Sequence, residues 1–191
     1  MDVKKISETM GPFFETLARD VAAVIQKLGL PHTADILDVG TGDGYSAIIL
    51  AASGYKVLTG EPATDDSRYA GKNWQERAEK VGVLDRIRSM PFVAEDMPFP
   101  DGSFDAVFFF GVLHHIEESL RRETFREAMR VTKDTGTVVF FEPTKEMLPK
   151  ILLKDPEHPA AACPADYASE FKKCEARLPG TFMDAFIFTK S

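Results

Sequence analysis

The feature that most constrains this chain is a glycine-rich turn between an apolar strand and an apolar helix. Residues 36–39 read Ile-Leu-Asp-Val, glycines follow at positions 40, 42 and 44, and residues 45–52 are mostly apolar. A short apolar run that ends in Gly-x-Gly-x-Gly and opens a helix is typical of the first unit of a nucleotide-type site in an open α/β sheet. The turn therefore predicts a ligand site at the carboxyl end of the first strand.

The spacing of these glycines narrows the choice of ligand. The dinucleotide fingerprint Gly-x-Gly-x-x-Gly needs its third glycine where this chain has Tyr45, and a P-loop needs a Gly-Lys-Ser/Thr that is absent here. Residues 34–55 contain no Lys or Arg but do contain Asp35, Asp38 and Asp43. An acidic segment without basic side chains is poorly suited to a diphosphate, so the spacing and the charge both disfavour a dinucleotide.

The rest of the chain alternates between strands and helices, which predicts a doubly wound, mostly parallel α/β sheet. Strands are expected at residues 36–39, 55–60, 87–93, 104–110 and 137–141, and helices at residues 5–28 (divided at Gly11-Pro12), 45–52, 67–80, 117–132 and 145–154. Pro91 cannot donate to a sheet ladder, so the third strand is expected at a sheet edge. Residues 171–178 and 182–189 read as two more strands, and their short link allows only antiparallel pairing. The prediction is a seven-stranded Rossmann-like sheet that ends in an antiparallel hairpin.

Length and composition set the broad class. The 191 residues predict a single domain over residues 1–191, in which about residues 1–30 form a helical cap. A net charge of −7 argues against a nucleic-acid partner, because phosphate affinity rests on Lys and Arg. Two cysteines do not indicate a disulfide scaffold, and neither a signal peptide nor a membrane-spanning run is visible. A cytoplasmic protein without membrane partners is therefore expected, and its oligomeric state stays open.

With Asp38 two residues before Gly40, the glycine turn resembles motif I of class I S-adenosylmethionine-dependent methyltransferases. The resemblance extends over about residues 34–189 and implies that S-adenosylmethionine is the cofactor. Glu61 matches the acidic residue with which the family binds both ribose hydroxyls, and a carboxylate suits that role because it accepts two hydrogen bonds at once. Asp96 and Met97 match the pair that contacts the adenine. The resemblance assigns cofactor binding to Asp38, Gly40, Thr41, Gly42, Gly44, Tyr45, Glu61, Asp96, Met97 and Gly111.

The acceptor side of the site is expected just after the fourth strand. Residues 102–107 and 112–115 resemble the fourth-strand motif of small-molecule methyltransferases, which implies a small-molecule acceptor. Adjacent residues of an extended segment face opposite ways, so of His114 and His115 we take His114 as the catalytic candidate. The alternative is that one histidine binds in the pocket while the other packs in the core. Tyr45 and Glu142 are further candidates for a base.

Residues 144–168, after the fifth strand, form a short insertion, which favours a small or partly exposed acceptor. Phe13, Phe14 and Tyr167 are expected to line its pocket. No metal site is predicted, because the potential ligands lack a recognised spacing. These residues are Asp155, Glu157, His158, Cys163 and Cys174.

Two other functions stay open at this point. One is a non-catalytic S-adenosylmethionine-binding module or partner subunit. The other is a nicotinamide-dependent oxidoreductase, which the glycine spacing and the terminal hairpin disfavour. The sequence does not determine whether the acceptor atom is N, O, C or S.

Overall fold

The computed structural model of the protein describes residues 3–70, 73–168 and 174–190, and within them the strands form one seven-stranded sheet. The strands are β1 (Ile36–Val39), β2 (Val57–Gly60), β3 (Ile87–Ser89), β4 (Phe104–Phe110), β5 (Thr132–Pro143), β6 (Cys174–Leu178) and β7 (Met183–Thr189). Their order is β3-β2-β1-β4-β5-β7-β6; the first five are parallel, and β7 runs antiparallel to both of its neighbours. The predicted parallel sheet with a reversed terminal hairpin is confirmed.

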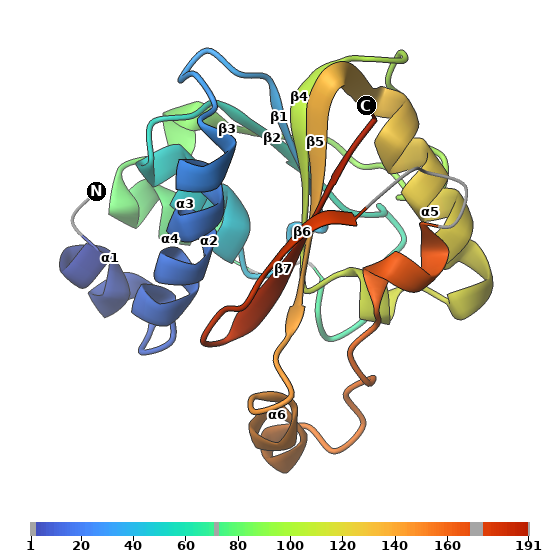
Figure 1. The fold of residues 1–191 in the computed structure, drawn as a ribbon. Helices are drawn as coiled ribbons and strands as arrows, with labels where there is room; N and C mark the ends of the chain where they lie inside the picture. The colour runs from blue at the N-terminus through green and yellow to red at the C-terminus, as the bar shows by residue number, and fades with distance from the viewer. Residues whose placement is uncertain (1–2, 71–72, 169–173, 191) are drawn as a thin grey trace.

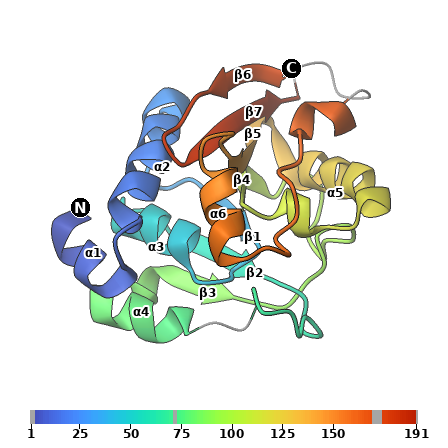
Figure 2. The same ribbon diagram turned by 90° about the horizontal axis from the view of Figure 1, so that it is seen from below.

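Helices cover both faces of this sheet. They are α1 (Val3–Met10), α2 (Phe14–Leu28), α3 (Tyr45–Ala52), α4 (Trp74–Val81), α5 (Glu118–Val131) and α6 (Leu148–Lys154), with short 3-10 turns at Leu84–Arg86, Leu113–His115 and Pro164–Tyr167. Figure 1 shows α1 to α4 on one side of the sheet and α5 on the other. Helix α6 lies beyond the carboxyl end of β5, at the front of the view from below in Figure 2. None of the described helices is long and apolar enough to cross a membrane.

The alternation of side chains along β4 divides the core into two clusters. Ala106 and Phe108 pack with α1 to α4, whereas Val107 and Phe109 pack with α5, and all four are fully buried. Successive residues of a strand point to opposite faces, so a strand covered on both faces is apolar throughout. This explains the continuous apolar run that the sequence shows at this strand.

Some predicted boundaries differ from the structure. Strand β3 does lie at the sheet edge, but it ends at Ser89, before Pro91. The helix predicted over residues 67–80 begins only at Trp74, because Asp65 accepts the Ser67 N–H and starts a turn instead. Strand β5 begins at Thr132 rather than at residue 137, and β6 is described from Cys174 onward, so residues 171–173 of the predicted strand lie outside the described residues.

The N-terminal segment predicted as a helical cap consists of α1 and α2, separated at Gly11 and Pro12 as expected. Phe14 and Val21 of α2 are fully buried against the sheet and α3. Helix α2 therefore belongs to the layer that covers this face of the sheet.

Candidate active site

A cavity of about 990 Å³ opens at the carboxyl ends of β1, β2 and β4. Residues 40–42 line it after β1, Gly60 and Glu61 at the end of β2, and Gly111 and Val112 after β4. Ligands of open α/β sheets bind at this edge. The volume lies at the upper end of the roughly 300–1,000 Å³ of ligand pockets, so the cavity can hold more than one small molecule.

The glycine turn depends on residues without a Cβ. Gly40, Gly42 and Gly44 have φ angles of +83°, +45° and +77°, which side chains strongly disfavour. A Cβ on Gly40 would lie 2.4 Å from Cγ2 of Val112, and one on Gly44 would lie 2.7 Å from Cβ of Trp74. These glycines therefore let the turn pack tightly against the end of β4 and the start of α4.

Glu61 connects this turn to the end of β2. Its Oε2 accepts the backbone N–H of Gly42 at 2.9 Å, and the side chain lies at the cavity. The carboxylate predicted for ribose binding is therefore fixed beside the glycine backbone. Its role in binding stays a prediction.

Asp38 supports the turn from below the cavity. The Thr59 hydroxyl donates to Asp38 Oδ2 at 2.8 Å, and the Thr41 hydroxyl donates to Thr59 Oγ1 at 3.0 Å, because the only proton of Thr59 already goes to Asp38. Asp38 is fully buried, and its Oδ1 has no hydrogen-bond partner within the described chain. Burial, only partly opposed by the neighbouring hydroxyls, raises the pKa of Asp38 to about 7. Asp38 thus holds Thr41 in place without reaching the cavity.

The structure brings together seven of the eleven residues predicted for the site. The cavity is lined by Gly40, Thr41, Gly42, Tyr45, Glu61, Gly111 and His114. Asp38, Gly44, Asp96 and Met97 are not part of its lining.

The loop after β3 does reach the cavity, but with other residues than the predicted pair. Phe92, Ala94 and Glu95 line the cavity, while Asp96 is exposed and Met97 is buried in the α5-side core. The Met97 backbone is held there because its N–H donates to Glu127 and its C=O accepts from Arg130, both on α5. An adenine-contacting role for Asp96 and Met97 stays a prediction that the geometry does not support.

His114 belongs to a buried acid–imidazole pair. Its Nδ1 lies 2.7 Å from Oε2 of Glu142 on β5, which also accepts the Ala162 N–H at 3.0 Å. Both side chains are almost completely buried. When Glu142 is ionised its carboxylate can only accept, and Nδ1 then carries the proton and leaves Nε2 as the free ring nitrogen.

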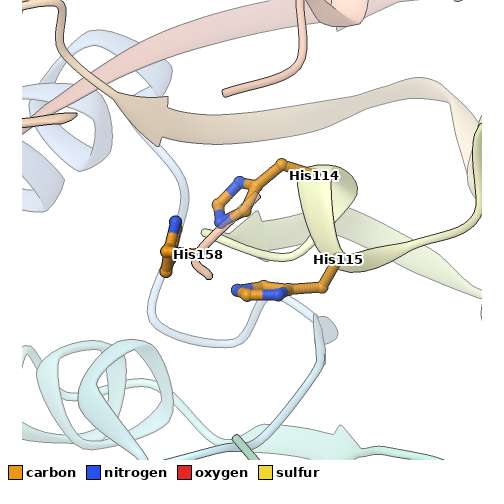
Figure 3. A group of neighbouring side chains, drawn as sticks. All are labelled: His114, His115 and His158. Atoms are coloured by element: carbon orange, nitrogen blue, oxygen red, sulfur yellow. The ribbon is translucent and has the colours of Figure 1, made fainter. Parts of the chain in front are cut away.

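Two further histidines surround His114. The ring centroids of His114 and His115 lie 4.3 Å apart, and each lies 5.0 Å from that of His158. All three residues line the cavity, and Figure 3 shows their rings facing a common space. Burial, followed by the neighbouring imidazoles, lowers the pKa of His115, and burial also lowers the pKa of His158. Both shifts favour the neutral form of these rings.

The charged groups of the cavity are mostly acidic. Among the described residues that line it, the acidic ones are Asp43, Glu61, Asp65, Glu95, Glu117 and Glu118, and Arg121 is the one permanent cation. The Arg121 guanidinium already donates to the carbonyls of Ile116 and His114 and to the hydroxyl of Tyr167. The cavity therefore favours a cationic ligand over a phosphate.

Comparison with known proteins agrees with this geometry. The methyltransferase domain family matches residues 37–140, more than half of the chain. The chain belongs to this methyltransferase family. The resemblance to class I S-adenosylmethionine-dependent methyltransferases is thereby confirmed.

Similar proteins include characterised and uncharacterised methyltransferases. An uncharacterised methyltransferase of Mycobacterium tuberculosis is 34% identical over 133 residues, which is 66% of this chain and 48% of that protein. The 27-O-demethylrifamycin SV methyltransferase of Amycolatopsis mediterranei is 33% identical over 101 residues, 53% of this chain and 35% of that protein. The chain thus spans about half, or less, of the length of the curated relatives it matches.

Solved structures share the fold. A putative S-adenosylmethionine-dependent methyltransferase from Methanococcus maripaludis superposes with a TM-score of 0.71 at 18% identity, covering 97% of this chain and 89% of that one. A methyltransferase from Aquifex aeolicus covers both chains completely, with a TM-score of 0.64 at 18% identity. At this identity the likeness shows the fold alone.

The terminal hairpin supplies a wall of the cavity that the sequence did not predict. Phe182 and Met183 line the cavity, and Phe13 packs edge-to-face on Phe182 at 5.4 Å. Asp20 of α2 accepts the backbone N–H groups of residues 181–183 at 2.8 to 3.0 Å. Asp20 lies about 160 positions before these partners, so no local sequence pattern predicts the contact. The only sign of it in the sequence is a lone polar residue on the apolar face of α2.

Of the three aromatic residues expected to line the acceptor pocket, only Phe13 lines the cavity. Phe14 is fully buried in the core, and Tyr167 binds Arg121 outside the lining. Phe13 is the N-cap residue that precedes α2, whereas Phe14 begins the helix and is buried beneath it.

Proposed function

We propose that this domain binds S-adenosylmethionine in the cavity and transfers its methyl group to a small-molecule acceptor. The observation that carries the proposal is the contact between the Gly42 N–H and the Glu61 carboxylate, at the base of an acid-lined cavity of about 990 Å³. Family membership implies this cofactor, and the cavity has room for a second molecule beside it.

The residues present fit the cofactor chemically. S-adenosylmethionine carries a sulfonium and an ammonium cation and no phosphate, which suits six carboxylates and a single engaged guanidinium. Glu61 can accept from ribose hydroxyls while it holds Gly42, because a carboxylate has about four acceptor sites. When bound, the cofactor supplies an electrophilic methyl group.

The chain itself orients the acceptor. Glu142 holds the ring of His114 so that Nε2 is directed to the cavity. There it can bind the acceptor or take up its proton, and Glu142 would then stabilise the resulting imidazolium. Phe13 and Phe182 add an apolar edge-to-face pair to the lining of the same cavity.

A small-molecule acceptor is supported by the relatives. One of them is named for 27-O-demethylrifamycin SV, and a structural neighbour with a TM-score of 0.63 is described as a geranyl diphosphate methyltransferase in complex with the cofactor. The short segment between β5 and β6 also leaves the cavity accessible to a small substrate.

Isothermal titration with S-adenosylhomocysteine tests cofactor binding. We expect micromolar affinity that falls at least about tenfold in Glu61→Ala and in Gly42→Val. In the second variant a β-branched residue would have to adopt the backbone φ of +45° that Gly42 has. The control is Glu76→Ala, which removes an exposed carboxylate of α4 paired with Lys80 and should leave the affinity unchanged. Binding of NADH without binding of S-adenosylhomocysteine would refute the proposal.

Catalysis is tested separately, with methyl-labelled cofactor and mixed metabolites. Transfer of label to any acceptor establishes an enzyme. Tight cofactor binding without transfer to any acceptor would instead support the non-catalytic module.

A further inference from the structure

We propose that His114, His115 and His158 form a site for a divalent first-row metal ion of the zinc type, with an open coordination position on the cavity. The three imidazoles reach one another from two separate segments, the turn after β4 and the loop after α6. The three histidines line the same cavity as the proposed methyl donor, but the metal site does not require S-adenosylmethionine to be bound there.

The spacing of the ring nitrogens suits one ion. One ligand nitrogen from each histidine lies within 4.8 Å of the others. Tetrahedral zinc with bonds of about 2.05 Å places its nitrogens about 3.3 Å apart. The observed nitrogen–nitrogen distances therefore exceed those of a tetrahedral site by at most about 1.5 Å. If two side chains share this difference, each nitrogen moves by less than about 1 Å, which small rotations of the rings provide.

Two of the three rings already have the outer partners that metal-bound histidines require. The Nδ1 of His114 is held by Glu142 at 2.7 Å, and the Nδ1 of His158 lies 2.8 Å from the backbone carbonyl of Pro159. A carboxylate or a carbonyl on one nitrogen fixes the ring orientation and makes the other nitrogen the ligand. In both residues that other nitrogen is Nε2.

The third ring is also positioned for a ligand. His115 packs on Tyr69 with ring centroids 4.2 Å apart, and neither of its nitrogens has a hydrogen-bond partner among the described residues. The Tyr69 hydroxyl donates to Asp155, which also binds Arg68. This contact connects the loop before α4, whose Tyr69 packs on His115, to the loop that carries His158. It therefore holds the rings of His115 and His158 close to each other.

Three imidazoles in mutual contact would repel one another if protonated, and neutral imidazole is the form that binds metals. The Glu142 carboxylate, buried behind His114, compensates part of the charge of an ion at this position.

Three protein ligands with one open position are typical of catalytic rather than structural zinc sites. The open position faces the cavity, where water or a hydroxyl or thiol of the acceptor would bind and would lose its proton more easily. This activation of an acceptor rests on the proposed function, whereas the metal site itself does not. With the ion bound, Nε2 of His114 is a ligand, so its role as a base would be confined to the metal-free protein.

Metal titration of chelator-treated protein tests the site. We expect one equivalent of Zn²⁺ in calorimetry and a tetrahedral visible spectrum with Co²⁺. His115→Gln and His158→Gln should each weaken binding at least about 100-fold, and Glu142→Gln about 10-fold. His32→Gln removes the one histidine outside the cluster and should bind as the wild type does.

Unchanged binding in His115→Gln and His158→Gln, an octahedral cobalt spectrum, or no stoichiometric binding would each overturn the site. Both substitutions affect side chains that are not fully buried, so equal metal-free melting temperatures can confirm that the variants fold. Titration of the same samples with S-adenosylhomocysteine separates the two proposals. Zinc binding without cofactor binding refutes only the proposed function, and the reverse result refutes only the metal site.

Discussion

Replacement of Asp38 by Asn should change how the stability of the protein depends on pH. Asp38 is fully buried, and burial raises its pKa from 3.8 to about 7. Between these values the folded protein holds a proton on Asp38 that the unfolded chain has released, so the contribution of Asp38 to the free energy of unfolding falls as the pH rises. A neutral Asn does not titrate and lacks this dependence.

The size of the effect follows from the two pKa values. A difference of about 3 units, at 1.36 kcal/mol per unit, gives about 4 kcal/mol between pH 4 and pH 8. Other carboxylates titrate in both proteins and cancel in the comparison. The stability of Asp38→Asn relative to the wild type should therefore rise by about 4 kcal/mol across this range, whatever constant offset the amide introduces.

Urea unfolding of both proteins at each unit from pH 4 to pH 8 measures this difference. Asp134→Asn is the matched control, because the Asp134 side chain is 99% exposed and its relative stability should not change with pH. A difference between Asp38→Asn and the wild type that stays constant over the range would refute the reasoning. So would one that falls as the pH rises.

Three further substitutions probe the support of the site. Gly40→Ala should lower the free energy of unfolding by about 1–3 kcal/mol and weaken cofactor binding, because the new Cβ would lie 2.4 Å from Val112 at a φ of +83°. Equal calorimetric and urea-unfolding data for the variant and the wild type would contradict this. Glu127→Ala should cost about 2 kcal/mol in urea unfolding, since it leaves the Met97 N–H without its acceptor and removes one of the acceptors of the Arg130 guanidinium. Glu123→Ala, on the exposed side of the same helix, should cost less than about 1 kcal/mol, and similar values for the two would refute the distinction. Asp20→Ala should cost about 3 kcal/mol in the same assay, because three backbone N–H groups lose their acceptor, and a loss below about 1 kcal/mol would contradict that role.

The order of the strands and the reversed hairpin could be predicted because each rests on a local signal. The apolar run at residues 104–110 indicates a strand buried on both faces, and the short link before Met183 allows only an antiparallel pair. Boundaries were predicted less well, since they depend on side-chain contacts. The start of α4 shifts to Trp74 because Asp65 forms a local turn, which composition alone does not reveal.

The part of the cavity formed by the glycine turn and Glu61 could be predicted from the sequence, and the part formed by His115, His158 and Phe182 could not. The glycine turn and Glu61 lie at strand ends, so the topology of the sheet brings them together. His158 follows His115 by 43 positions and reaches it only through the path of the loop after α6. No periodicity or spacing signals such a contact. The same holds for Phe182, whose place on the cavity depends on Asp20.

A crystal structure with S-adenosylhomocysteine would show whether the carboxyl ends of β1, β2 and β4 hold the methyl donor. We expect the ligand against the backbone of Gly40 and Gly42, with its ribose hydroxyls within hydrogen-bond distance of the Glu61 carboxylate. A ligand bound at another place, or a cavity that stays empty at saturating concentration, would contradict it.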